Sequence, residues 1–525
     1  MVSQVEPQAV KEMLSDGQEI AFLDVREHGQ FGDGHPFFAN SVPYSKFEVR
    51  LVEAVPVPLV RMILYDNADG IAELAAARAE ALGYTNVSIM AGGAAGWKAA
   101  GFTLYKGENV PTKTFGEILE HEYDTPNLTS EEVVALTKEN PNYIIVDSRP
   151  YNEYHAFNIP GGICCPNGES PLRIGELVPD PETTIIVNCA GRTRSILGAE
   201  TLRAFGVPNP VYALQNGTQG WFLAGLKREE GATRSYPDAP TSEEKLSALR
   251  TQAKARAEKT GLKYVEPAEA AEWLAATDRS TFLIDVRSEE EYAADGLPNT
   301  RHVLGGQLVQ AMDLWVGVRG ARVVLMDNEM VRAPMMANWL HQIGNDVYIL
   351  NGGVDAMRGV SIPEIPAYNT DKVATVTPAE IEDDMQLVDI RTPRAYRDGH
   401  IDGAAWSIRP RFEQLGLSAD KPVVLIAPDD GTAALAAQRC GELGCSDIRQ
   451  LSGDAAAWSA AGLKVVPVTT APAEDETINI VYHWQHRNNP NGGTAEAANA
   501  YLDWEIGLVD QLDDQERASF RLAPL

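Results

Sequence analysis

The sequence predicts an α/β fold of four tandem domains, each with a central parallel β-sheet flanked by helices. Four apolar strands end at a residue that lies 17 positions before a glycine, and these pairs are Asp66 and Gly83, Cys189 and Gly206, Asp327 and Gly344, and Ala427 and Gly444. Upstream of each pair stands a D-x-R tripeptide, in LDVR, VDSR, IDVR and VDIR. Short apolar strands that alternate with helical stretches are typical of parallel βα units. A repeat period of about a hundred residues makes each copy a domain with its own core, not a solenoid repeat.

The elements of each copy follow the same order. A helix-start signal comes first, clearest in Thr377-Pro378-Ala379-Glu380, where Thr caps, Pro takes the first helical position and Glu completes a capping box. The D-x-R strand follows, then the strand that leads to the 17-residue interval. A further apolar strand ends in a glycine-rich turn, in MAGGAAGW, LQNGTQGW, LNGGVDAM and LSGDAAAW.

These signals set the expected boundaries. Repeats of about a hundred residues are expected at 1–105, 124–228, 263–366 and 373–468, with a helical linker at 229–262 and a C-terminal extension at 469–525. In the linker, TSEEKLSALRTQAKARAEKTG predicts a mostly polar surface helix that ends at Gly261. In the extension, INIVYHW alternates like a strand and TAEAANAYLDWEIGLVDQL looks like an amphipathic helix. We expect the extension to pack as an arm on a neighbouring domain or on a second subunit.

Composition excludes several classes of protein. The formal charge of −30 over 525 residues argues against nucleic acid or an anionic membrane as a partner. There is no apolar run long enough to span a membrane, and MVSQVEPQAV lacks the features of a signal peptide. The five cysteines include no CxxC pair, so we expect reduced thiols in the cytoplasm and no zinc ribbon. His483 and His486 have no cysteine or carboxylate cluster beside them, so we expect neither a metal nor a cofactor.

One copy differs from the others in its capacity for chemistry. The four equivalent positions hold Asp, Cys, Asp and Ala, and of these only the thiolate of Cys189 is a nucleophile. Cys189 lies where a strand leads into a helix, and a helix N-terminus favours negative charge. Arg192 and Arg194 crowd the first turn of that helix, which is unfavourable unless an anion lies between them. The alternative is that both arginines pair with nearby carboxylates, Glu153 among them.

Taken together, the D-x-R strand end, the EY-type helix start and the C-x-x-x-x-R loop resemble the rhodanese (sulfurtransferase) family. The resemblance covers the chain from its start to about Val468 as four tandem domains, and VDSRPYNEYHAFNIPGG with NCAGRTRS is the best match. It implies an α/β fold and a reaction in which Cys189 takes sulfane sulfur from a donor and passes it on through a persulfide. The loop residues Ala190, Gly191, Arg192, Thr193 and Arg194 would bind the donor, and the other three copies would be inactive.

The support residues around the loop are expected to be structural. Asp147 and Arg149 recur in all four copies, including those without a nucleophile, so we expect them to tie a strand end to a turn. Trp221 has counterparts at Trp97 and Trp458 and is expected in the core. Cys164 and Cys165 are expected to be buried, with a resolving role left open. In the third copy, Arg332 is expected to neutralise Asp327, whereas the first copy offers no cation after Asp66.

Three functions stay open at this point. Six residues from Cys189 to Arg194 are the loop length that suits sulfur transfer in the family, whereas the related Cdc25-type phosphatases have their arginine one place later, where this chain has Ser195. A phosphatase or arsenate reductase is therefore the second hypothesis, and a non-enzymatic sulfur-carrier scaffold is the third.

The paired-domain family members carry an arginine at the place of Glu153, and CAGRTR matches neither CRKGVT nor CGSGVT. Thiosulfate is the favoured donor because two arginines suit a compact dianion. The acceptor (a thiol, cyanide or a protein) and a homodimer are left open.

Overall fold

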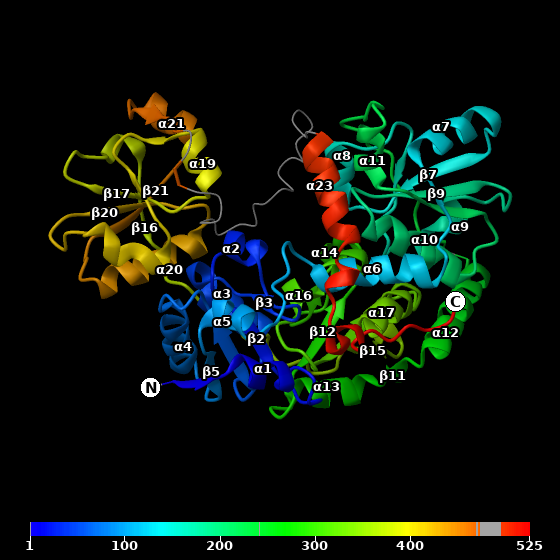
Figure 1. Cartoon of the computed structure of the whole chain (residues 1–525), viewed down its shortest axis with the longest axis horizontal. Helices are drawn as coiled ribbons and strands as arrows, with labels where there is room; N and C mark the ends of the chain where they lie inside the picture. The colour runs from blue at the N-terminus through cyan, green and yellow to red at the C-terminus, as the bar shows by residue number, and fades with distance from the viewer. Residues whose placement is uncertain (1, 241, 469–470, 473–494) are drawn as a thin grey trace. The chain divides into compact units, whose positions relative to one another are not determined.

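The computed structural model describes residues 2–240, 242–468, 471–472 and 495–525, and this part of the chain folds into four α/β domains (Figure 1). By their contacts the domains group into two compact units, one with the first and fourth domains and one with the second and third. The four-domain α/β fold predicted from the sequence is confirmed.

Each domain is built on a five-stranded sheet with one strand order. Counted along the chain within a domain, that order is 1-5-4-2-3, and the four sheets are β1-β5-β4-β2-β3, β6-β10-β9-β7-β8, β11-β15-β14-β12-β13 and β16-β21-β20-β17-β19. All the described pairings within these sheets are parallel. The central strands are buried along most or all of their length, as TIIVN is in the second domain, because helices cover both faces.

The first domain and the second domain contain the following elements. The first has β1 (Ser3–Val5), α1 (Pro7–Met13), β2 (Ala21–Asp24), α2 (His28–Asp33), β3 (Asn40–Ser41), η1 (Tyr44–Lys46), α3 (Phe47–Ala54), β4 (Met62–Tyr65), α4 (Ile71–Ala81), β5 (Val87–Met90) and α5 (Gly93–Ala99). After α6 (Val110–Glu122), the second has β6 (Asn127–Leu128), α7 (Ser130–Glu139), β7 (Tyr143–Asp147), α8 (Tyr151–Ala156), β8 (Ile163–Cys164), α9 (Ser170–Leu177), β9 (Thr184–Asn188), α10 (Thr193–Phe205), β10 (Val211–Leu214) and α11 (Gly217–Leu223).

The third and fourth domains repeat this order. After α12 (Glu243–Thr260), the third has β11 (Lys263–Val265), α13 (Pro267–Ala275), β12 (Thr281–Asp285), α14 (Glu289–Asp295), β13 (Arg301–His302), α15 (Gly305–Gln310), α16 (Met312–Trp315), β14 (Arg322–Met326), α17 (Arg332–Ile343), β15 (Asp346–Leu350) and α18 (Gly353–Ala356). The fourth has β16 (Ala374–Val376), η2 (Pro378–Glu380), β17 (Gln386–Asp389), α19 (Pro393–Asp398), β18 (His400–Ile401), β19 (Ala405–Trp406), η3 (Arg409–Leu415), β20 (Val423–Ile426), α20 (Asp430–Glu442), β21 (Ile448–Leu451), α21 (Ala455–Ala460) and β22 (Val465–Val466). The C-terminal segment has α23 (Ala495–Ile506), η5 (Val509–Gln511) and α24 (Asp514–Arg517).

The segments outside the repeats pack on the second unit. The predicted linker helix is α12, which ends at Gly261 in a left-handed conformation and packs Ala253 and Ala257 against the unit. The amphipathic helix predicted after the repeats is α23, which lies against α6 and α11 (Figure 1). The predicted strand INIVYHW, together with His483 and His486, lies outside the described residues. No described helix combines the length and the apolar character needed to cross a membrane.

A buried carboxylate–guanidinium pair at the end of the second strand recurs in every domain. Arg149 donates from Nε and NH2 to the two carboxylate oxygens of Asp147 at 2.9 and 2.8 Å, and NH2 also donates to the Phe157 carbonyl. The same pairs form in the other domains, as Asp24–Arg26, Asp285–Arg287 and Asp389–Arg391. Each arginine also reaches a carbonyl eight residues further along the chain, which ties the strand end to the turn after the next helix. The structural role predicted for Asp147 and Arg149 therefore agrees with their contacts.

Arg149→Met is expected to destabilise the second domain strongly, because it leaves the buried Asp147 carboxylate without its cation. Breaking a buried pair in this way costs about 3–5 kcal/mol. Because the domains need not unfold together, we would compare amide hydrogen exchange in β7 in the variant and the parent. The matched control is Arg234→Met in the same domain, whose ion pair with Glu229 is exposed and worth at most about 1 kcal/mol. Equal protection of β7 in the two variants would contradict the role assigned to the pair.

Candidate active site

The loop that carries Cys189 lies at the point where the strand order of the second sheet reverses. It follows β9 and precedes α10, and β9 is paired with β7, whose last residue is Asp147. In open α/β sheets, ligands bind beyond the carboxyl ends of the strands at this switch point. The sequence prediction that Cys189 stands between a strand and a helix is therefore confirmed.

A glycine turn after β10 holds the backbone of the loop. The amides of Thr218 and Gln219 donate to the carbonyls of Cys189 and Ala190, at 2.9 and 3.2 Å. Gly217 has φ +50°, and a Cβ there would come within 2.4 Å of the Cys189 carbonyl oxygen. Only glycine permits that approach, which explains the glycine-rich turn found in the sequence.

Every loop residue from Cys189 to Arg194 is buried, and the cysteine side chain is 1% exposed. The thiol donates to the Arg192 carbonyl, with Sγ 3.8 Å from the oxygen. Arg194 donates from both terminal nitrogens to Glu153, at 2.7 and 2.8 Å. Although burial opposes it, Glu153 and the nearby Cys189 raise the pKa of Arg194. The pairing of Arg194 with Glu153, which the sequence left as an alternative, is thus present in the structure.

Arg192 is bound by carboxylates from outside the domain. Its Nε and NH2 donate to Glu117 at 2.7 and 2.8 Å, NH2 also donates to Glu120, and NH1 donates to Asn216 at 3.1 Å. Glu117 and Glu120 lie on α6, in the stretch between the first two expected repeats. The helix comes this close because position 116 is glycine, where a Cβ would lie 2.9 Å from Cγ2 of Thr193.

The C-terminal helix α23 covers the same side of the loop. Glu505 accepts a hydrogen bond from the Thr193 hydroxyl, and its carboxylate lies 3.7 Å from Nζ of Lys113. Lys113 also donates to the Tyr501 hydroxyl at 3.0 Å. A Cβ on Gly191 would lie 2.9 Å from the Tyr501 ring, so α23 leaves no room for a larger residue there. The side chains that contact the loop therefore come from three separate parts of the chain.

The first and third domains have a carboxylate at the position equivalent to Cys189. Asp327 accepts from the amides of Val331, Arg332 and Ala333, at 3.1, 3.1 and 3.2 Å. Asp66 accepts in the same way from the amides of Ala68, Gly70 and Ala72, at 2.8, 3.1 and 3.0 Å. In both domains the amides at the start of the helix therefore bind the carboxylate of the aspartate that begins the loop. Arg332 lies 3.7 Å from Asp327, as predicted.

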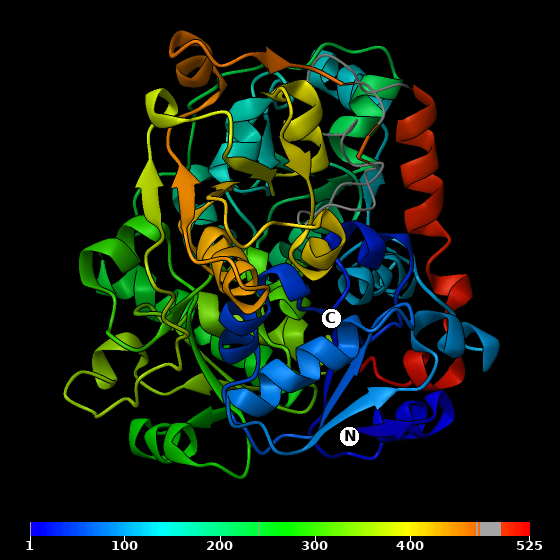
Figure 2. The same cartoon turned by 90° about the vertical axis from the view of Figure 1, so that its left-hand side faces the viewer.

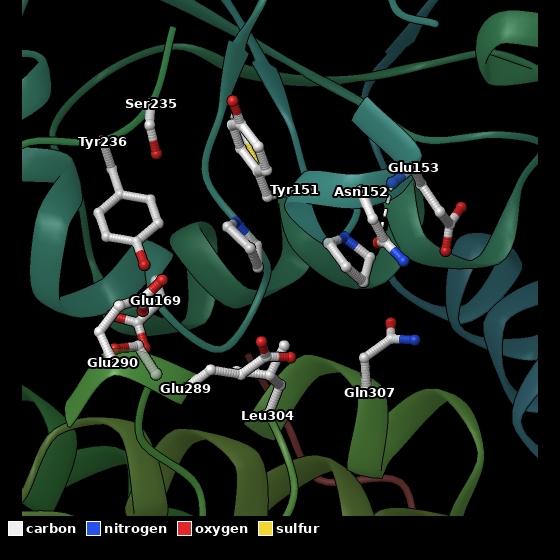
Figure 3. Close-up of a pocket in the computed structure, with 14 residues that line it drawn as sticks. Tyr151, Asn152, Glu153, Glu169, Ser235, Tyr236, Glu289, Glu290, Leu304 and Gln307 are labelled. Atoms are coloured by element: carbon white, nitrogen blue, oxygen red, sulfur yellow. Dashed lines mark hydrogen bonds between the residues drawn. The ribbon is translucent and has the colours of Figure 1, made fainter. Parts of the chain in front are cut away.

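A cavity of about 580 Å³ lies beside the Cys189 loop, between the second and third domains (Figure 3). Segments that occupy equivalent places in the two repeats line it, residues 150–153 and 166–169 from the second domain and 288–290 and 304–307 from the third. Glu153 belongs to this lining and to the ion pair with Arg194, so one wall of the cavity contacts the loop. Its other acidic residues, Glu169, Glu289 and Glu290, make the cavity unattractive to an anion.

The two other cysteines of this domain are core residues. Burial raises the pKa of Cys164 to about 12 and that of Cys165 well above its ordinary value. Cys165 packs in the main hydrophobic cluster of the domain, and Cys164 packs against Tyr154. Within the described ranges, no group of three or more His, Cys, Asp or Glu side chains is arranged to hold a metal ion. Trp97, Trp221 and Trp458 are buried, as expected.

Comparison with known proteins now decides the family. The model of the rhodanese-like domain matches residues 6–100, 129–224, 266–359 and 377–461. The chain belongs to the rhodanese-like family. A crystal structure of the thiosulfate sulfurtransferase from Pseudomonas aeruginosa is 37% identical, covers 100% of both chains and superposes with a TM-score of 0.88.

Two further likenesses are partial. The HTH-type transcriptional regulator Rv0324 of Mycobacterium tuberculosis is 36% identical over 95 residues, which are 18% of this chain and 41% of the regulator. The chain thus covers less than half of that relative's length. A structure of EanB in complex with ergothioneine is 16% identical over 70% of this chain and 100% of the other, with a TM-score of 0.25, and carries no argument.

The rhodanese loop was predicted from the sequence, but the residues of α6 and α23 that cover it were not. Lys113, Glu117 and Glu120 recur at helical spacing on one face of α6, a signal that was present in the sequence. Tyr501 and Glu505 are likewise one turn apart on α23. Spacing predicts that such residues share a face, but it does not predict which loop that face contacts.

Gly116→Ala is expected to disturb the loop, because the added methyl group would push Thr193 away from α6. Overpacking of this kind costs about 1–3 kcal/mol, and we expect a lower thermal midpoint together with a lower rate of Cys189 alkylation or turnover. The matched control is Gly175→Ala on α9, where an added Cβ meets no atom within 4 Å. That control should be neutral or slightly stabilising. If both variants behaved alike, the close approach of α6 would be irrelevant to the loop.

Proposed function

We propose that this rhodanese-family protein is a sulfurtransferase that moves sulfane sulfur from thiosulfate, through a Cys189 persulfide, to a thiophilic acceptor. The observation that carries the proposal is the cysteine at the head of α10 in a chain that aligns over its full length with a thiosulfate sulfurtransferase. The loop architecture supports an anionic sulfur there, because the same loop binds a carboxylate in the first and third domains.

The reaction divides into two displacement steps. In the first, the Cys189 thiolate attacks the outer sulfur of thiosulfate, a new S–S bond forms, and sulfite leaves with the electron pair of the broken bond. In the second, the acceptor, such as cyanide or a thiolate, attacks the outer sulfur of the persulfide and the Cys189 thiolate is regenerated. No external oxidant or reductant is needed, and no cofactor takes part in this scheme.

Arg194 is the cation best placed to hold the sulfonate end of the donor. Its pKa is raised in part by Cys189, so the guanidinium lies within electrostatic reach of the sulfur. Among the described residues its ion-pair partner is one carboxylate, Glu153, which is 27% exposed. Arg192 is held by Glu117 and Glu120 and serves to fix the loop.

The phosphatase hypothesis finds less support. A phosphatase loop would need its arginine at position 195, where this chain has a serine. The Ser195 hydroxyl donates to the carbonyls of Arg192 and Leu214, so it faces backbone acceptors and not a bound anion. The carrier-scaffold hypothesis differs from the proposal only in the acceptor, and a strong preference for a protein acceptor over small thiols would favour it.

Cys189→Ser is expected to abolish thiocyanate formation from thiosulfate and cyanide, since a hydroxyl cannot carry the sulfur. Cys164→Ser and Cys165→Ser are the matched controls and should keep most of the activity per folded molecule. After thiosulfate treatment, only a peptide that contains Cys189 should gain the mass of one sulfur, about 32 Da. Turnover by the Cys189→Ser variant would rule out the assignment.

Arg194→Ala is expected to slow persulfide formation, because it removes a charge-assisted hydrogen bond to the donor. Such a bond contributes about 1.5–3 kcal/mol, which corresponds to roughly a 10- to 150-fold lower second-order rate with thiosulfate. Arg203→Ala, on the same helix, is the matched control and should react at the parent rate. The measurement is the initial release of sulfite before any acceptor is added, and an unchanged rate in Arg194→Ala would contradict the role.

A further inference from the structure

One side of the Cys189 loop is covered by two helices that do not belong to the rhodanese repeats. Glu117 and Glu120 come from α6, and Glu505 comes from α23. Glu505 is 1% exposed although its helix lies at the edge of the unit (Figures 1 and 2) and Asp503, on the same helix, is exposed. Of the residues in α23, only Tyr501, Leu502 and Glu505 are buried.

Negative charge exceeds positive charge on this side of the loop. Among the described side chains, the carboxylates of Glu117, Glu120 and Glu505 face two cations, Lys113 and Arg192. Burial raises the pKa of Glu117 to about 7 and outweighs the effect of Arg192, and Glu505 and Glu120 raise it further. Although burial opposes it, Lys113 and the Thr193 hydroxyl lower the pKa of Glu505, so Glu505 stays ionised.

We propose that Glu505 is a charge-selecting residue of the Cys189 site, which slows the entry of highly charged anionic donors while α23 is docked on the loop. Its carboxylate accepts from the Thr193 hydroxyl, so a full negative charge stands against the loop that must receive the donor. A second negative charge that enters the same buried region is repelled, and the repulsion grows with the charge of the donor. This inference rests on the proposed role of Cys189, but it concerns the charge around the loop and not the sulfur chemistry.

The experiment compares two alkylating reagents that differ by one charge. Glu505→Gln keeps the shape and the hydrogen-bonding capacity of the side chain and removes the charge. At about pH 8.5, where Glu117 is ionised in both proteins, the ratio of Cys189 alkylation by iodoacetate to that by iodoacetamide should rise about 10-fold in the variant. For the same reason, the rate at which Cys189 reacts with thiosulfate, a dianion, should rise in the variant relative to its rate with methanethiosulfonate, a monoanion. A peptide map would confirm that Cys189 is the residue labelled.

Two further variants distinguish the effect of the Glu505 charge from the effect of α23 covering the Cys189 loop. Asp503→Asn removes the same charge from the exposed face of the same helix, so both reagents should react with it at the parent rates. Leu502→Ala weakens the docking of α23 without changing charge, since Leu502 is 4% exposed, and it should speed both reagents by a similar factor. The thermal midpoint of each variant shows that the domain is folded.

The outcomes distinguish this inference from the proposed function. An unchanged reagent ratio in Glu505→Gln, or an equal rise in Asp503→Asn, would overturn the role of Glu505 even if sulfurtransfer is present. If the reagent ratio rises in Glu505→Gln alone but no protein forms a persulfide with thiosulfate, the charge selection stands and the proposed reaction fails.

Discussion

The structure depends on the amide groups that begin the helix after each domain's fourth strand, because these donors have no partner within the helix. Asp66 and Asp327 satisfy them with a side-chain carboxylate, and in the fourth domain Asp429 accepts from the Thr432 amide at 2.7 Å. The second domain has Cys189 at this place. A carboxylate at this place therefore satisfies amide donors that, in the reaction we propose, the Cys189 loop leaves for a thiolate and its sulfur donor.

The arginine that closes the loop has different partners in the second and third domains. Arg194 and Arg332 occupy equivalent positions, five residues after Cys189 and Asp327. Arg332 is fully buried and pairs with Glu169 of the second domain, so it joins the second and third domains. Arg194 pairs within its own domain. The third repeat, which has Asp327 in place of a cysteine, thus uses its arginine as a packing contact between two domains.

The sequence predicted the four domains, the D-x-R pair and the position of Cys189, because these depend on periodicity and on contacts close along the chain. It did not predict that Glu117 and Glu505 would contact the loop. Glu505 and Thr193 are 312 positions apart, and helical spacing identifies a polar face without identifying its partner. For the same reason, the sequence could not decide whether Arg192 binds a donor or a carboxylate of the chain.

The electrostatic environment of Cys189 therefore belongs to the assembled unit and not to the second domain alone. A chain with net charge −30 would repel an anionic donor from much of its surface, and α6 and α23 add carboxylates at the loop itself. Within the loop, two arginines and the helix N-terminus act in the opposite direction. Glu117, Glu120 and Glu505 lie on helices outside the repeats, so these added helices supply part of the restraint on an anionic donor, whereas the attraction comes from the rhodanese fold.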